Sequence, residues 1–145
     1  MNPDIRSLLD SEGCYFREDS TLVDQALLRI NAQPIDVFCE FYRHYEGPFS
    51  SDYTGVILSD IVVGPKSSVK GLTMRCRLMH GFGFHHLVLA DLCGESITVY
   101  DWKSDKVYDV DFEGGVDLLK EGTLKPQWNS FEEFLDFYFL GIRPT

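Results

Sequence analysis

The residues best suited to chemistry in this 145-residue chain are the histidines and cysteines near its middle. The side chains there that can bind a metal ion are Cys76, His80, His85, His86, Asp91 and Cys93. Zinc sites take two close ligand pairs joined by short, regular loops, and these spacings are irregular. His85 and His86 are neighbours in a segment expected to be a strand, where adjacent side chains point to opposite faces. We therefore predict no metal site and no cofactor.

Enzymatic chemistry finds equally little support in the sequence. Cys93 lies in an expected turn near the histidines, but a Cys–His hydrolase also needs donors for an oxyanion, and no such element is visible. The segment 81–86, GFGFHH, has two of the three glycines of a dinucleotide loop without its strand and helix. The carboxylates of the helical segments resemble ordinary solvated helix faces. We predict that the chain is not an enzyme; a small hydrolase or metalloenzyme is the alternative that bound metal or a reactive cysteine would reveal.

The elements that position these residues include four expected helices. Apolar residues recur at the spacing of one helical face in residues 2–11, 21–30, 34–45 and 130–140. The last of these begins with Ser130 three residues before Glu133, a capping box that satisfies two backbone donors at a helix start. These helices lie near the two ends of the chain.

The middle of the sequence changes to the period of strands. Residues 54–63 are β-branched and bounded by glycine, and residues 72–79 alternate loosely, so we expect a strand in the first and a strand or edge segment in the second. Residues 85–92, 95–102 and 106–112 predict three consecutive antiparallel strands joined by tight turns. The sequence thus predicts an α+β fold, an antiparallel or mixed meander packed against N-terminal and C-terminal helices, in one domain over residues 1–145.

The charge of the chain restricts its partners. The formal net charge is −10, and residues 91–121 alone carry nine acidic and three basic groups. A field of this sign repels nucleic acid and anionic membranes and attracts basic partners. No export signal opens the sequence, no stretch reaches the ~20 apolar residues of a membrane span, and the four cysteines lie far apart without a CxxC motif. We expect a cytoplasmic protein with reduced cysteines.

Several motifs occur in a fixed order along residues 20–140. They are Gln33-Pro34 through Phe41-Tyr42 to Tyr45-Glu46-Gly47, then Gly83 to Gly94, then Val99-Tyr100-Asp101, and finally Ser-Phe-Glu-Glu-Phe-Leu at 130–135. In this order and spacing the chain resembles the SUKH superfamily, which includes bacterial Smi/Knr-type immunity proteins, yeast cell-wall synthesis regulators and the Syd protein.

The resemblance implies a mixed sheet packed with helices and no catalytic residues. Many bacterial members of the superfamily neutralise a toxin domain, frequently a nuclease, whereas eukaryotic members act as scaffolds or regulators. We therefore expect an immunity-type protein that binds a cognate toxin domain one to one, as a monomer or weak homodimer. A regulatory or scaffold module that binds proteins is the alternative.

Acidic residues interleaved with aromatic ones are the expected partner-binding residues, because carboxylates speed the encounter and a buried ring supplies an anchor. The densest group is Asp101, Trp102, Asp105, Tyr108, Asp109, Asp111 and Glu113. A second candidate is the loop 46–54, with Phe49 and Tyr53 expected at its exposed tip. Two alternatives stay open: the rings pack in the core while the aspartates line turns, and the loop is an ordinary connection.

Overall fold

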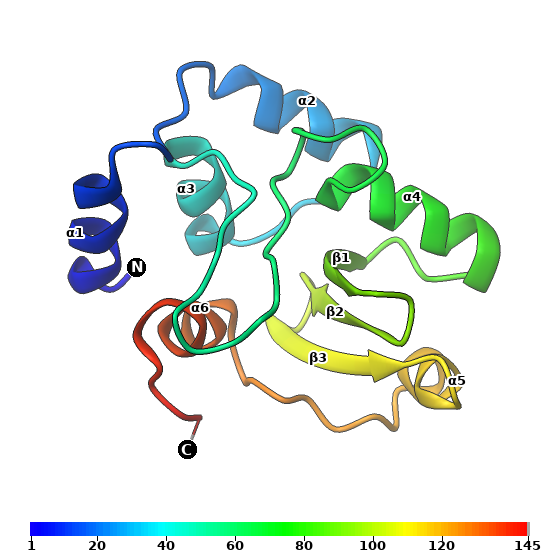
Figure 1. Cartoon of the computed structure of the whole chain (residues 1–145). Coiled ribbons are helices and arrows are strands. Elements are labelled where there is room, and N and C mark those ends of the chain that lie inside the picture. The colour runs from blue at the N-terminus through cyan, green and yellow to red at the C-terminus, as the bar shows by residue number, and fades with distance from the viewer. Residues whose placement is uncertain (145) are drawn as a thin grey trace.

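A computed structural model describes residues 1–144, which form six helices and a three-stranded antiparallel sheet (Figure 1). The helices are α1 (Pro3–Glu12), α2 (Thr21–Arg29), α3 (Asp36–His44), α4 (Val69–His80), α5 (Gly115–Glu121) and α6 (Phe131–Leu140). The strands, in spatial order, are β1 (His86–Leu92), β2 (Ser96–Asp101) and β3 (Lys106–Asp111). The predicted α+β class and the three-stranded meander are confirmed. Within the described residues, no helix combines the length and the apolar character that crossing a bilayer requires.

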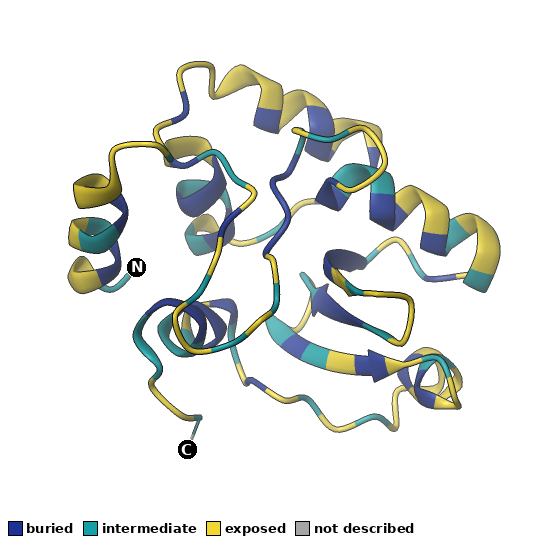
Figure 2. Cartoon of the chain, in the orientation of Figure 1, coloured by how far each residue is buried: buried dark blue, intermediate teal, exposed yellow. Residues whose placement is uncertain are grey.

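Helices cover both faces of the sheet. Tyr100 and Val107 point into a large aromatic core that they share with α1, α2, α3 and α6. Ile97, Val99 and Val110 point the other way, into a smaller core beneath α4 and α5. Because both faces are covered, the four central residues of β2 are all buried. Figure 2 shows this buried centre between the exposed outer surfaces of the helices.

Helix α6 begins as the sequence predicts, but only half of its capping box forms. The Ser130 hydroxyl accepts a hydrogen bond from the Glu133 N–H at 3.0 Å, whereas Oε1 of Glu133 is buried without a partner in the described part of the chain. The expected apolar face of α6 is confirmed: Phe131, Phe134, Leu135, Tyr138 and Phe139 are all buried.

The strand predicted for residues 54–63 is wrong. Leu58 pairs with Phe49 through an isolated bridge, and the next residue, Ser59, donates instead to the Leu89 carbonyl at 2.9 Å. The two carbonyls after that accept hydrogen bonds from the first turn of α4. The segment is apolar because much of it is buried, yet its backbone groups are divided among three neighbours and build no ladder.

The strand or edge segment predicted for residues 72–79 is also wrong, because this stretch lies inside α4. Its buried residues, Val69, Leu72, Thr73 and Cys76, recur at helical spacing against β1. Leu78 conceals this pattern in the sequence, because it is apolar but 87% exposed. The neighbouring methionines are also apolar and exposed, to a lesser degree.

One glycine sets the position of α4. A Cβ on Gly71 would lie 2.2 Å from the Pro65 carbonyl oxygen, far inside van der Waals contact. Replacing Gly71 with Ala is therefore expected to lower the free energy of unfolding by about 1–3 kcal/mol, although alanine normally stabilises a helix. Urea denaturation measures this, with Lys70→Ala in the same turn as the control. An unchanged or increased stability of the Gly71→Ala variant would show that the close approach is relieved at no cost.

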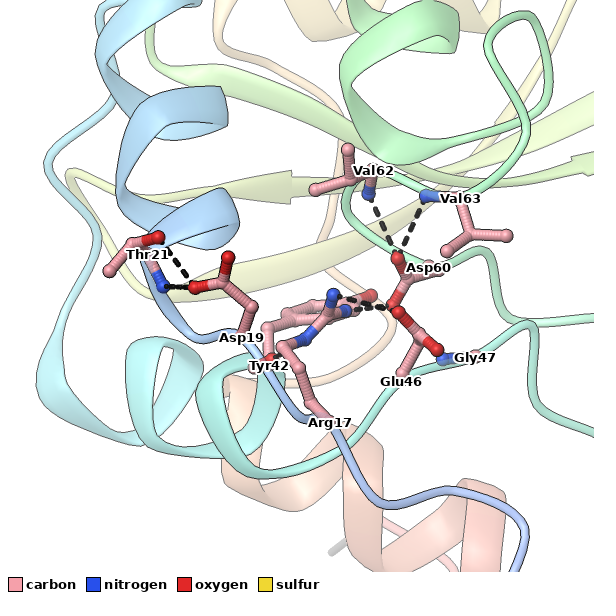
Figure 3. Close-up of polar contacts among 9 residues, drawn as sticks. All are labelled: Arg17, Asp19, Thr21, Tyr42, Glu46, Gly47, Asp60, Val62 and Val63. Carbon is pink, nitrogen blue, oxygen red and sulfur yellow. Dashed lines mark hydrogen bonds and ion pairs between the residues drawn. The ribbon is translucent and has the colours of Figure 1, made fainter.

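A buried arginine joins the N-terminal segment to the middle of the chain (Figure 3). Only 4% of Arg17 is exposed. Its Nε donates to the Tyr42 carbonyl at 2.7 Å, and its guanidinium forms ion pairs with Asp60 and, at 3.3 Å, with Glu46. All three partners lie outside the segment that carries Arg17, so this side chain holds separate parts of the fold together.

Asp60, the buried partner of Arg17, organises the loop that follows α3. Asp60 is 1% exposed, and its Oδ1 accepts from the Gly47 N–H at 3.0 Å. Its Oδ2 accepts from the N–H groups of Val62 and Val63 at 3.0 and 2.9 Å (Figure 3). The carboxylate is thus fully hydrogen-bonded, which buried charge requires. It fixes both ends of residues 47–63, part of which borders the site described next.

Candidate functional site

The acidic residues of β3 are the exposed part of the predicted binding surface. Asp109, Asp111 and Glu113 are exposed, and none of them forms an ion pair with the part of the chain that the structure describes. Asp111 also has a structural role: its Oδ1 accepts from the N–H groups of Glu113 and Gly115, at 2.9 and 3.1 Å, where the chain enters α5. The three carboxylates therefore form a surface of unbalanced negative charge.

The same strand has a free edge. The N–H of Val107 donates to the Trp128 carbonyl and its carbonyl accepts from the Trp128 N–H, both at 3.0 Å, so Val107 directs its backbone away from β2. Alternate residues of an antiparallel strand direct their backbone groups the same way. Asp109 therefore presents its N–H and carbonyl outward, beyond the short stretch that Trp128 covers. An open edge of this kind can pair with an extended segment of another protein.

An apolar pocket opens beside Asp109. It has a volume of about 360 Å³. It lies between α6 and the part of the sheet that contains Leu92, Thr98 and Asp109. Its aromatic wall consists of Trp128, Phe134, Phe137 and Tyr138. The Trp128 ring lies 5.0 and 5.3 Å from those of Phe134 and Phe137, and its indole N–H is buried without a hydrogen-bond partner among residues 1–144. An aromatic pocket with a carboxylate at its mouth suits a large apolar side chain or the stem and charge of a lysine or arginine.

The walls of this pocket affect Asp109 itself. Desolvation raises the pKa of Asp109 above its ordinary value of 3.8. A carboxyl whose pKa is raised by folding destabilises the folded chain once it is ionised, so its cost is present near neutral pH and disappears as pH falls through the raised pKa. Asp109 is thus unfavourable for stability where it stands, which is common for residues that serve binding.

Replacing Asp109 with Asn is therefore expected to increase the free energy of unfolding at pH 7. The difference from the wild type should shrink as pH is lowered through the raised pKa of Asp109, because the wild-type carboxyl then takes up its proton. Urea denaturation at a series of pH values measures this, with Asp117→Asn on α5 as the control. A variant less stable than the wild type at pH 7 would contradict the assignment.

The predicted residues of the β2–β3 turn are engaged within the fold. Asp105 accepts hydrogen bonds from the Tyr100 hydroxyl at 2.9 Å and from the Phe131 N–H at 3.3 Å, which ties the turn to the start of α6. Trp102 is half-buried and donates from its indole to the Phe84 carbonyl at 3.0 Å. These contacts fit the alternative in which the rings pack within the fold and the aspartates line turns.

Tyr108 lies apart from the acidic surface. It is half-buried on the α4 and α5 side of the sheet, whereas Asp109 faces the α6 side. Burial raises the pKa of the Tyr108 hydroxyl. The predicted group is therefore split between two faces of the sheet, with Asp109, Asp111 and Glu113 as its exposed acidic part.

The expected exposure of Phe49 is wrong, whereas that of Tyr53 is confirmed. Phe49 is 1% exposed, because its bridge to Leu58 turns the ring inward against Phe41 and Phe139, at 5.0 and 5.9 Å. Tyr53 is 58% exposed. Of the two loop residues, Tyr53 alone is available to a partner.

The structure also brings together residues that the sequence separates. The rings of His85 and His86 lie 4.0 Å apart, and both face Asp101 at the end of β2. The expectation that they point to opposite faces is wrong, because His85 lies in a turn closed by the His86 N–H on the Gly83 carbonyl, at 3.2 Å, and not in the strand. Burial, with His85 beside it, lowers the pKa of His86 to about 4, so its imidazole is neutral near pH 7.

The other members of the sequence cluster do not join these three. Cys76 is buried on the inner face of α4, Asp91 pairs with Arg75 at 3.2 Å, and Cys93 is exposed in the β1–β2 turn. The His80 ring stacks on Phe112 at 5.1 Å.

In comparisons with known proteins, no protein-family model and no curated protein matches the chain.

Proposed function

We propose that this chain is a non-enzymatic immunity-type protein, and that it holds a basic toxin domain inactive by binding it through the open edge of β3 and the pocket beside that edge. The observation that carries the proposal is the position of Asp109, Asp111 and Glu113. These carboxylates are exposed and lack cationic partners among the described residues, and Asp109 lines an aromatic pocket.

The sign of the charge supports the kind of partner. A toxin domain that cleaves nucleic acid needs a basic surface to hold its phosphates. An acidic surface of comparable size competes for that surface, steers the encounter and fixes the register of the complex. The resemblance to the SUKH superfamily points to the same class of partner.

The geometry supports a specific mode of contact. Charge alone gives fast association and little discrimination, so a lasting complex also needs a desolvated anchor. The pocket walled by Trp128, Phe134 and Phe137 can take one side chain of the partner, while the outward backbone of Asp109 can pair with the segment that carries it. Binding of this kind covers the basic surface of the toxin without any chemical step.

Co-expression with the protein encoded immediately upstream, reduced to its C-terminal domain, tests the proposal. We expect this domain to stop growth when produced alone, the present chain to restore growth, and the two to purify as one complex. Restored growth without a complex, or a toxic domain that this chain neither binds nor neutralises, would contradict the proposal. Weak binding to several unrelated proteins would instead identify a regulatory or scaffold module.

A further inference from the structure

The β1–β2 hairpin places two histidines and one aspartate at the same end of the sheet. His86 and Asp101 are direct partners in the antiparallel register, so their side chains lie on the same face. The turn that precedes β1 adds His85 to this pair. This cluster lies on the α4 side of the sheet, away from the pocket beside Asp109, and the proposed function makes no use of it.

The distances within the cluster fit the coordination of a small cation. Nδ1 of His85 lies 3.1 Å from Oδ1 of Asp101, and Nε2 of His86 lies 3.9 Å from Oδ2 of the same carboxylate. One ligand atom from each residue falls within 4.8 Å of the others. Two ligand atoms bound tetrahedrally to zinc are about 3.4 Å apart, given zinc–ligand bonds of about 2.0–2.2 Å. Small rotations of the two rings therefore bring all three groups to bonding distance.

The buried histidine lacks the hydrogen bonds that its burial demands. His86 is 4% exposed, and its Nδ1 is buried without a partner in the described part of the chain. Its Nε2 lies 3.9 Å from Oδ2 of Asp101, beyond hydrogen-bond distance. Buried polar atoms are nearly always satisfied, and an unsatisfied one points to a missing ligand. A metal ion bonded to Nε2, the nitrogen on the Asp101 side, would supply one of the two contacts that this ring lacks.

The backbone beside the rings leaves room for the cluster. A Cβ on Gly83 would lie 3.0 Å from Nε2 of His85, so a larger residue there would require the His85 ring to shift by a few tenths of an ångström, whereas the 4.0 Å distance to Nδ1 of His86 is an ordinary contact. Arg77 on α4 is the cation that faces the cluster, with its guanidinium donating to the Phe84 carbonyl at 2.8 Å. Its charge limits the affinity for a dication without occupying the ligand atoms.

We propose that His85, His86 and Asp101 bind one divalent transition-metal ion of the zinc type. Two imidazoles and a carboxylate are a ligand set that zinc accepts, and three protein ligands leave a coordination position open. The side chains of His85 and Asp101 are 31% and 13% exposed, so this position can be reached from solvent.

Isothermal titration calorimetry of the tag-free, chelator-treated protein with ZnCl₂ tests this site. The four histidines of the chain allow matched variants: His85→Ala removes a proposed ligand, and His44→Ala and His80→Ala remove histidines elsewhere. Asp101→Asn removes the charge of the third ligand while keeping an acceptor oxygen for the backbone of Lys103. We expect one site per chain, at least ~10-fold weaker in His85→Ala and Asp101→Asn and unchanged in the two controls.

Two further measurements keep the result decisive. Thermal unfolding of each variant without metal shows that it is folded, and added zinc should raise the melting temperature of the wild type but not of His85→Ala. A Cys14→Ser/Cys93→Ser variant removes the two exposed thiols and should bind zinc as the wild type does. No saturable binding, binding equal in the wild type and His85→Ala, or binding lost with the thiols would each overturn the proposal.

Discussion

Replacing Arg17 with Ala is expected to lower the free energy of unfolding by about 3–5 kcal/mol, the largest loss of stability that we predict for this chain. The change leaves the carboxylate of Asp60, which is 1% exposed, buried without its countercharge. It also removes the hydrogen bond to the Tyr42 carbonyl and the ion pair to Glu46. Urea denaturation of the wild type and variant measures the loss.

An exposed pair with the same chemistry is the matched control. Arg43 and Asp24 are joined at 2.6 Å, but their side chains are 47% and 53% exposed. Exposed ion pairs contribute little, so Arg43→Ala should cost no more than ~1 kcal/mol. Equal losses for Arg17→Ala and Arg43→Ala would contradict the account, because burial would then have no influence on the pair.

The buried pair also matters to the binding surface. Asp60 fixes the residues at both ends of the 47–63 loop, and Thr54 and Val56 from that loop border the pocket beside Asp109. Loss of Arg17 should therefore loosen one wall of the pocket as well as the fold.

Replacing Asp109 with Lys is expected to weaken the complex with the basic partner at least ~30-fold, which corresponds to about 2 kcal/mol. The change puts a positive charge at the mouth of the pocket, opposite the cation expected from the partner. Because the site is partly desolvated, most of the loss should lie in a faster dissociation rate. Surface plasmon resonance with the toxin domain identified by growth rescue measures both rates.

Two variants with the same change of charge separate the pocket from the general field. Glu12→Lys on α1 lies outside the acidic surface and should leave the affinity within about twofold of the wild type. Asp117→Lys on α5 lies in the acidic region but not at the pocket, and should mainly slow association, more so at low salt. If all three variants weaken binding alike, net charge is responsible and the pocket beside Asp109 has no special role.

Local pattern was enough to predict much of the fold. The hairpin strands alternate between two buried faces, and the Ser130 cap and the aromatic face of α6 are adjacent in sequence, so both could be predicted. Helix α4 could not, because Leu78 and its exposed neighbours are apolar on the solvent side and hide the helical period. Residues 54–63 could not, because their backbone partners lie in three distant segments.

The candidate site divides in the same way. The acidic character of β3 and of Glu113 is plain in the sequence. The pocket is not, because its walls come from segments around residues 54–56, 92–98 and 127–138 that meet only in the fold. The approach of His85 to His86 depends on a turn at Gly83, whereas the sequence predicted that His85 belongs to a strand.

Hydrogen–deuterium exchange of this chain, with and without the toxin domain that it neutralises, tests the central claim most directly. In the free protein the outward amide of Asp109 is open to solvent, so we expect fast exchange there and marked slowing in the complex across residues 107–113 and 127–138. Slowing confined to α1, α2 and α4, with the edge of β3 unchanged, would contradict the proposed binding surface.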